Sequence, residues 1–178
     1  MPQPTARVAT RGRMTRTFND SLKEVHDAHY ASLFRYFDRL SGDPDLAADV
    51  VQEAFVRLYR RGTLPDQPDH WLVTVALNLF RNERSTARRR GALRLQHGTD
   101  LSPAGQPTPA ESAETIERQA RVRAALDGLS RRERELLLLR AEGYGYRDLA
   151  AILELNEASV GTLLARARQA FRANWEER

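Results

Sequence analysis

The sequence predicts an all-α protein made of two helical modules joined by a flexible, Pro/Gly-rich linker. Apolar residues recur at helical spacing in both halves, and no segment alternates apolar and polar residues as a strand would. Residues 96–112 separate the halves and contain three prolines, two glycines and one large apolar residue, which is typical of a linker. We therefore expect a disordered basic tail at 1–17, a first module at 18–95, a linker at 96–113 and a second module at 114–178.

The first module should hold three antiparallel helices around a shared core. Apolar positions predict a helix over about 20–40, which Ser41-Gly42 ends. Asp43-Pro44 favours the start of a second helix, because the aspartate can cap free N–H groups and proline suits the first turn. A third helix is predicted over about 70–89. Its expected inward residues are Trp71, Leu72, Val75, Ala76, Leu79 and Phe80.

The second module should hold four shorter helices, the first at 114–127. Ser130 and Glu133 have the spacing of a capping box, which predicts the start of the second helix. A two-turn helix is expected at 146–153, and Asn156 then caps a longer fourth helix. A short helix, a three-residue turn and a longer helix form the outline of a helix-turn-helix.

The composition excludes several classes of protein. No apolar run approaches the roughly 18 residues of a membrane span, and the basic N-terminal stretch lacks the apolar segment of a secretory signal, so we expect a cytoplasmic protein without membrane insertion. Without cysteine there are no disulfides or thiolate metal sites. His26 and His29 are spaced as a metal pair would be, but no third ligand lies nearby in the sequence. We expect no metal and no cofactor.

Charge is distributed unevenly along the first module, which indicates two different partners. Residues 20–69 hold ten acids and six bases, whereas residues 81–94 hold six arginines and one glutamate. The basic stretch suits a phosphate backbone, and its candidate DNA-binding residues are Asn78, Arg81, Arg84, Arg88, Arg89 and Arg90. Alternatively, these arginines form a solvated helix end that binds no partner. Trp71 could stack on an unpaired base, although a place in the core is the simpler interpretation.

The fourth helix of the second module leaves one face free if Val160, Leu164 and Ala167 are buried. Small residues at its N-terminal end would allow close approach to the major groove, Thr162 could contact a base edge, and the later arginines could reach phosphate. The candidate DNA-binding residues are Asn156, Glu157, Ser159, Gly161, Thr162, Arg166, Arg168 and Arg172. A small helical bundle with a solvated arginine-rich face is the alternative.

Three stretches resemble sigma factors of the extracytoplasmic-function (ECF) group. Residues 45–59, DLAADVVQEAFVRLY, look like the family's polymerase-binding helix; residues 71–78, WLVTVALN, followed by arginines, resemble the helix that reads and melts the minus-ten element. In the second half, residues 129–135 and 142–168 are similar to region four, which reads the minus-thirty-five element. The resemblance covers about residues 20–173.

The resemblance implies a subunit that directs core RNA polymerase to promoter DNA and aids melting. It implies that Asp49, Gln52, Glu53 and Phe55 bind the largest polymerase subunits, through a basic coiled coil, and that a dedicated anti-sigma factor is a further partner. This chain departs from the family's pattern at four positions. Gly161 and Leu163 replace a lysine and an arginine, Glu154 replaces the usual turn glycine, and Gly145 replaces a capping serine.

Two other classes of function compete with this interpretation. A helix-turn-helix regulator that acts without polymerase would need only the second module and would leave the acidic helix of the first unexplained. An enzyme acting on nucleic acid would need a carboxylate cluster, a phosphate-binding glycine loop or a nucleophile arrangement, and the sequence offers none of these.

Overall fold

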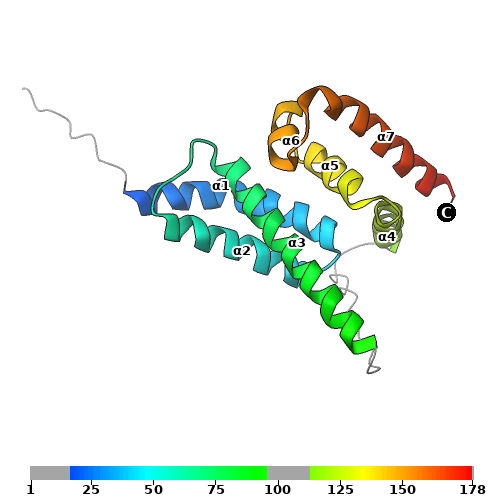
Figure 1. Cartoon of the computed structure of the whole chain (residues 1–178), viewed down its shortest axis with the longest axis horizontal. Helices are drawn as coiled ribbons and strands as arrows, with labels where there is room; N and C mark the ends of the chain where they lie inside the picture. The colour runs from blue at the N-terminus through cyan, green and yellow to red at the C-terminus, as the bar shows by residue number, and fades with distance from the viewer. Residues whose placement is uncertain (1–16, 96–112, 178) are drawn as a thin grey trace, which may run out of the picture.

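The computed structural model describes residues 17–95 and 113–177, and the predicted tail and linker lie almost wholly outside this range. The described part forms seven helices and no strand, which confirms the all-α prediction (Figure 1). The helices are α1 (Phe18–Ser41), α2 (Pro44–Arg61), α3 (Pro68–Leu95), α4 (Ala113–Asp127), α5 (Arg131–Ala141), α6 (Tyr146–Leu153) and α7 (Glu157–Glu176). Each helix in these residues is too short or too polar to cross a bilayer.

Local capping bonds set the ends of α1 and α2. The Asp43 carboxylate accepts hydrogen bonds from the N–H groups of Asp45 and Leu46, so α2 begins as predicted. Helix α1 begins two residues earlier than expected, because Thr17 and Asp20 form a capping box that the sequence analysis did not identify. Both helices end at a glycine in the left-handed conformation, Gly42 and Gly62. The N–H of each glycine donates to a carbonyl in the last turn of its helix, that of Asp38 in α1 and that of Tyr59 in α2.

Helix α3 is longer at both ends than predicted, and its buried stripe is rotated from the predicted one. It begins at Pro68, a residue suited to the first turn, and continues to Leu95. Leu72, Ala76 and Phe80 are buried as expected. Trp71, Val75 and Leu79 are only partly buried, whereas Val73 and Leu77, which the prediction left out, are fully buried. Helix α3 packs against α1 and α2 and also against α6 of the second module.

The second module follows the prediction closely. Ser130 and Glu133 form the predicted capping box of α5. Helices α6 and α7 have the predicted bounds, and three residues connect them as in a helix-turn-helix. Asn156 caps α7 by accepting a hydrogen bond from the Ala158 N–H at 3.0 Å. Near the far end of α7, the Asn174 amide donates to the Ala125 carbonyl at 3.0 Å and ties α7 to α4.

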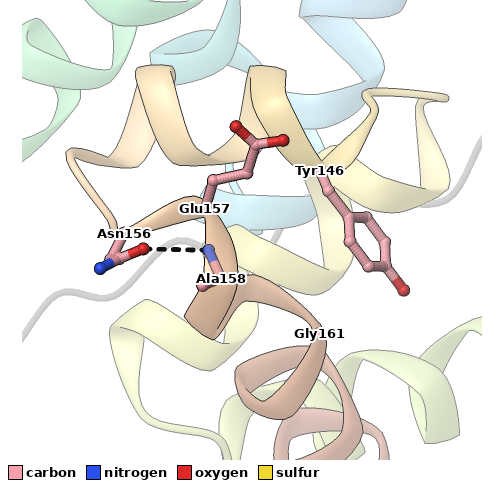
Figure 2. Close-up of a pocket in the computed structure, with 5 residues that line it drawn as sticks. All are labelled: Tyr146, Asn156, Glu157, Ala158 and Gly161. Atoms are coloured by element: carbon pink, nitrogen blue, oxygen red, sulfur yellow. Dashed lines mark hydrogen bonds between the residues drawn. The ribbon is translucent and has the colours of Figure 1, made fainter.

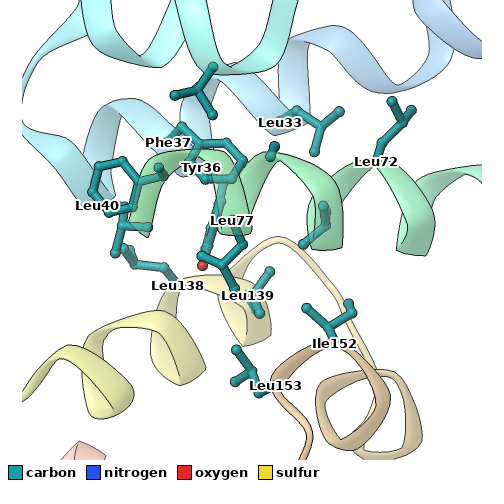
Figure 3. Close-up of a cluster of buried hydrophobic side chains, with 14 of the residues drawn as sticks. Leu33, Tyr36, Phe37, Leu40, Leu72, Leu77, Leu138, Leu139, Ile152 and Leu153 are labelled. Carbon is teal, nitrogen blue, oxygen red and sulfur yellow. The ribbon is translucent and has the colours of Figure 1, made fainter. Parts of the chain in front are cut away.

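The two modules pack against each other, a placement that the sequence left open. Helix α5 contacts α1, and α6 contacts α3, so a single hydrophobic cluster spans both modules. Figure 3 shows Tyr36 and Leu40 of α1 beside Leu138 of α5, and Leu77 of α3 beside Leu139 of α5, with Ile152 and Leu153 of α6 below. Helix α7 lies on the far side of α5 and α6 from the first module (Figure 1). The prediction of two modules is confirmed, but their cores are joined.

Candidate nucleic-acid and protein-binding surfaces

An acidic face on α2 carries the residues predicted to bind polymerase. Asp49 and Gln52 are exposed, and Glu53 is partly exposed with its carboxylate 3.0 Å from the Arg57 Nε. Phe55 differs from the other three, because only 9 % of it is exposed and it belongs to the hydrophobic cluster. Phe55 therefore lies mostly in the core, and little of its side chain is open to a partner.

An aromatic groove between α1 and α2 adjoins this acidic face. It encloses about 460 Å³ and is lined by Leu22, His26, Tyr30, Gln52, Phe55, Val56 and Tyr59. The His26 ring lies 4.9 Å from Phe55 and 5.0 Å from Tyr30, and 59 % of Tyr59 is exposed. His26 is thus engaged in ring contacts, and the described residues contain no group of three metal-ligating side chains.

This groove was not among the predicted surfaces, although the sequence spacing of its lining residues could have revealed it. Leu22, His26 and Tyr30 recur every four residues on α1, and Phe55 and Tyr59 do so on α2. Residues four apart share a helix face, so two such stripes on neighbouring helices face each other. An exposed apolar groove beside charged residues is typical of a protein-binding surface.

Helix α3 carries the candidate minus-ten residues, and the structure separates them into groups. Asn78 and Arg84 are exposed, and the Arg84 guanidinium lies 5.7 Å from the centre of the Phe80 ring. Arg88, Arg89 and Arg90 lie on the same helix, but their side chains are outside the described part. Trp71 packs against the core, as the simpler interpretation expected, and the Arg61 guanidinium lies 5.8 Å over its ring.

Arg81 is held by the other module. Its Nε and Nη2 donate to the two carboxylate oxygens of Glu135 on α5, at 3.2 and 2.7 Å. Glu135 is only 2 % exposed and is the one buried charged residue among the described side chains. Its hydrogen bond raises the pKa of the Arg81 guanidinium. This two-pronged ion pair joins residues 54 positions apart and was not predicted.

The free face of α7 matches the prediction for a recognition helix. Val160, Leu164 and Ala167 are buried, whereas Glu157, Thr162, Arg166, Arg168 and Arg172 are exposed. Two candidates have structural roles: Asn156 caps the helix, and the Ser159 hydroxyl donates to the Asn156 carbonyl at 2.7 Å. Both contacts lie at the end of α7 that would enter the groove.

Figure 2 shows Tyr146 beside the start of α7. Tyr146 was not among the predicted DNA-binding residues. An open hollow of about 630 Å³ is lined by Tyr146, Asn156, Glu157, Ala158 and Gly161. Tyr146 is 45 % exposed, and a Cβ added at Gly161 would lie 3.6 Å from its ring. Tyr146 is the first residue of α6, which corresponds to the helix that crosses the DNA backbone in a helix-turn-helix. Its place at the start of that helix could have identified it from the sequence.

A helix-turn-helix whose second helix has an exposed polar face, beside a helix rich in arginine, is typical of a DNA-binding protein. Two protein families match the chain: sigma-70 region 2 over residues 25–90, and sigma-70, region 4 over residues 119–171. Mycobacterium tuberculosis "ECF RNA polymerase sigma factor SigL" is 32 % identical over 88 % of this chain and 89 % of its own length. The chain belongs to the ECF sigma factors, which are transcription initiation factors of the sigma-70 family.

Other relatives agree with this assignment. "ECF RNA polymerase sigma factor EcfG" of Rhodopseudomonas palustris is 35 % identical over 85 % of this chain and 81 % of its own length. "ECF RNA polymerase sigma factor SigE" of Mycolicibacterium smegmatis is 31 % identical, and the match spans 85 % of this chain but 60 % of that relative.

Two solved structures share the fold. The Bartonella quintana sigma factor RpoE, in complex with the anti-sigma factor NepR, has a TM-score of 0.65 at 24 % identity and covers 89 % of this chain and 96 % of its own. CnrH, in complex with the cytosolic domain of CnrY, has a TM-score of 0.64 at 21 % identity and covers 89 % and 90 %.

Proposed function

We propose that this chain directs core RNA polymerase to promoters through three separate surfaces. The acidic face of α2 binds a basic element of the largest polymerase subunits, the basic face of α3 reads and melts the minus-ten element, and α7 reads the minus-thirty-five element. The supporting observation is that the first module exposes Asp49 and Gln52 on α2 and Arg84 on α3, while the second module leaves one face of α7 exposed. The sequence adds Arg88, Arg89 and Arg90 to the same helix as Arg84. Opposite charges on one small module suit two partners of opposite charge.

The proposal extends to partners and location. Because the function is to bind polymerase and DNA, we propose a binding subunit without catalytic activity, acting in the cytoplasm where transcription takes place. The RpoE and CnrH structures are complexes with NepR and CnrY. By analogy we propose that a dedicated anti-sigma factor inhibits this chain too.

Polymerase binding tests the α2 assignment. Replacing Asp49 and Gln52 by alanine should weaken binding to purified core polymerase by about 1 kcal/mol or more, roughly fivefold in Kd, because both exposed side chains lose their polar contacts. Fluorescence anisotropy of the labelled full chain measures this. Glu176→Ala, which removes one exposed acid from α7, is the control and should bind normally. A wild-type chain that binds promoter DNA but not core polymerase would instead support the polymerase-independent regulator.

Salt dependence tests the α3 assignment. Replacing Arg84, Arg88 and Arg89 by alanine should reduce promoter binding by the holoenzyme and flatten the dependence of log K on log salt by up to about 0.9 per lost phosphate contact. Arg118→Ala removes an exposed arginine from α4 and should leave the slope unchanged. An unchanged slope in the triple variant would show that these arginines do not touch DNA.

A further inference from the structure

The aromatic groove between α1 and α2 changes in character along its length. Gln52, Val56 and Tyr59 of α2 line the groove. Asp45 and Asp49 continue the same stripe toward the start of α2, because residues three or four positions apart share a helix face. The groove is therefore aromatic beside the end of α2 and acidic beside its start.

The aromatic end has the chemistry that binds a cation. Tyr59 is 59 % exposed, and the His26 ring lies 5.0 Å from Tyr30 and 4.9 Å from Phe55. The face of an aromatic ring attracts a guanidinium, and this chain makes that contact elsewhere, with an arginine 4.5 Å from the centre of the Trp175 ring. Among the described side chains, no arginine lies over the rings of the groove.

The acidic end also calls for cations. Asp45 and Asp49 are exposed, and neither carboxylate has an ion-pair partner among the described residues. Arg57, which follows Val56 along α2, is already paired with Glu53 at 3.0 Å. Because opposite charges across a contact fix its register, the groove suits an extended segment that carries several arginines with apolar side chains between them.

The first sixteen residues of this chain have that composition. Residues 1–16, which lie outside the described part, contain four arginines and no acid, and Val8 and Met14 stand between the arginines. A methionine sulfur makes favourable contacts with aromatic rings, as an arginine does. A segment with so few apolar residues cannot form a core of its own, but it can become ordered on a surface that binds it.

The segment also joins the fold at the correct place. It enters α1 at the aromatic end of the groove, where the Phe18 and Tyr59 rings lie 6.5 Å apart. The helix rises 1.5 Å per residue, so the start of α1 is about 20 Å from Tyr30 along the helix axis. An extended chain covers roughly 20 Å in about six residues. A segment that turns back along the groove therefore brings Arg11 to its acidic end.

We propose that residues 1–16 bind along the aromatic groove, with arginines over its rings and against Asp49, and thereby cover the acidic face of α2. The contact itself depends on the shape and charge of the groove. Its consequence rests on the proposed function: the segment competes with the basic element of polymerase for the same acids.

Paramagnetic broadening in the full-length chain tests the contact. The chain has no cysteine, so Thr10→Cys takes a nitroxide spin label at one place in the segment. Gln52 lines the groove, whereas Ala28 faces away from it on α1, because it lies two residues from both His26 and Tyr30 and each residue turns the helix by about 100°. We expect the label to remove the amide signal of Gln52 and to leave that of Ala28 visible.

Variants of both partners identify the interactions that hold the segment. Arg7→Glu combined with Arg11→Glu should restore the lost signal, because the segment then repels the acids of α2. Asp49→Asn and Tyr59→Ala should each restore part of it. Both side chains are exposed, so the fold should be retained, which circular dichroism and thermal melts verify. Glu176→Gln removes an exposed acid from α7 and is the matched control, for which the signal should stay lost.

Two results would overturn the contact: equal broadening of Gln52 and Ala28, or a signal that stays lost in the double arginine variant. A mixture of spin-labelled chains with separate, isotope-labelled chains tests for a second copy. We expect no loss of the Gln52 signal in the mixture. A loss there would show that the groove takes the segment of another molecule, and the proposal would fail.

Core polymerase tests the consequence. Replacing the four arginines of the segment by serine in the full-length chain should lower the Kd for core polymerase by roughly threefold or more, because a covered face reduces the apparent affinity by the fraction of molecules left uncovered. Arg118→Ser removes an exposed arginine from α4 and should leave the Kd unchanged. If the spin label detects the contact but the serine variant binds polymerase like the wild type, the contact stands and the shared use of the acidic face is refuted.

Discussion

Glu154 lies in the turn of the helix-turn-helix and is the only non-glycine residue with positive φ in the described part of the chain, at 54°. It ends α6 in the left-handed conformation, and the cap is closed by its N–H, which donates to the Ala150 carbonyl. The Cβ of an L-residue is strained in this region, whereas glycine is not. Glu154 stands where the resembling family usually has a turn glycine, and it adopts the left-handed conformation that glycine favours.

Glu154→Gly should therefore stabilise the protein by about 0.5–1 kcal/mol, because the relief of strain exceeds the extra entropy that glycine loses on folding. The melting temperature should rise by about 2 °C, measured by calorimetry. Glu154→Ala keeps the Cβ while removing the carboxylate and should give no gain. A stabilised alanine variant would show that the charge, and not the backbone, is unfavourable.

Helix α7 is the element whose sequence departs most from the expected pattern, since Gly161 lies inside it. Glycine in a helix interior costs about 1 kcal/mol relative to alanine. The structure provides room for a methyl group there, because an added Cβ would make an ordinary contact with Tyr146 at 3.6 Å. Stability alone therefore does not explain why Gly161 is glycine.

Gly161→Ala should stabilise the chain by about 0.5–1 kcal/mol in a denaturant titration. If close approach of α7 to DNA explains the glycine, the same variant should bind promoter DNA more weakly in holoenzyme. Gly128→Ala is the contrasting control and should destabilise, because its Cβ would lie 2.5 Å from the Asn174 amide nitrogen. A destabilised Gly161→Ala would contradict the space seen at this position.

Several element boundaries were predictable because a side chain caps the helix locally. Asp43, Ser130 and Asn156 each bond to an N–H two or three residues away, so nearby sequence contains the whole signal. The capping box of Thr17 and Asp20 is equally local but was not among the predictions. The burial of Val73 and Leu77 was not predicted either, and α3 also packs against α6, which lies far along the chain.

At the scale of the whole molecule, the buried Tyr36 and the partly buried Tyr144 lie where the modules meet. Burial, and then the nearby Glu135 charge, raises the pKa of Tyr36 well above its ordinary value of 10.0. Burial, followed by the charge of Asp69, also raises the pKa of Tyr144. Among the described residues the Tyr36 hydroxyl has no hydrogen-bond partner, and Figure 3 shows it pointing toward Leu138 of the second module.

Alkaline pH should therefore open or unfold the protein. A raised pKa in the folded state means that the stabilisation is complete below the ordinary tyrosine pKa and is lost progressively as pH rises above about 10. Tyrosinate absorbance and tryptophan fluorescence, followed together, should show the two tyrosines ionising with the loss of structure. Tyr36→Phe should shift this transition to higher pH. Early ionisation without structural change would show that the junction is hydrated.

By itself the sequence determined the helices, their caps, the two modules, the sigma-factor resemblance and the candidate surfaces on α2, α3 and α7. These features depend on residues a few positions apart, whose spacing already encodes the contact. Only the tertiary structure decided that an aromatic groove lies beside the acidic face and that Glu135 holds Arg81. Those contacts join residues tens of positions apart, and the balance of apolar burial, charge pairing and desolvation that forms them exists only once the helices pack.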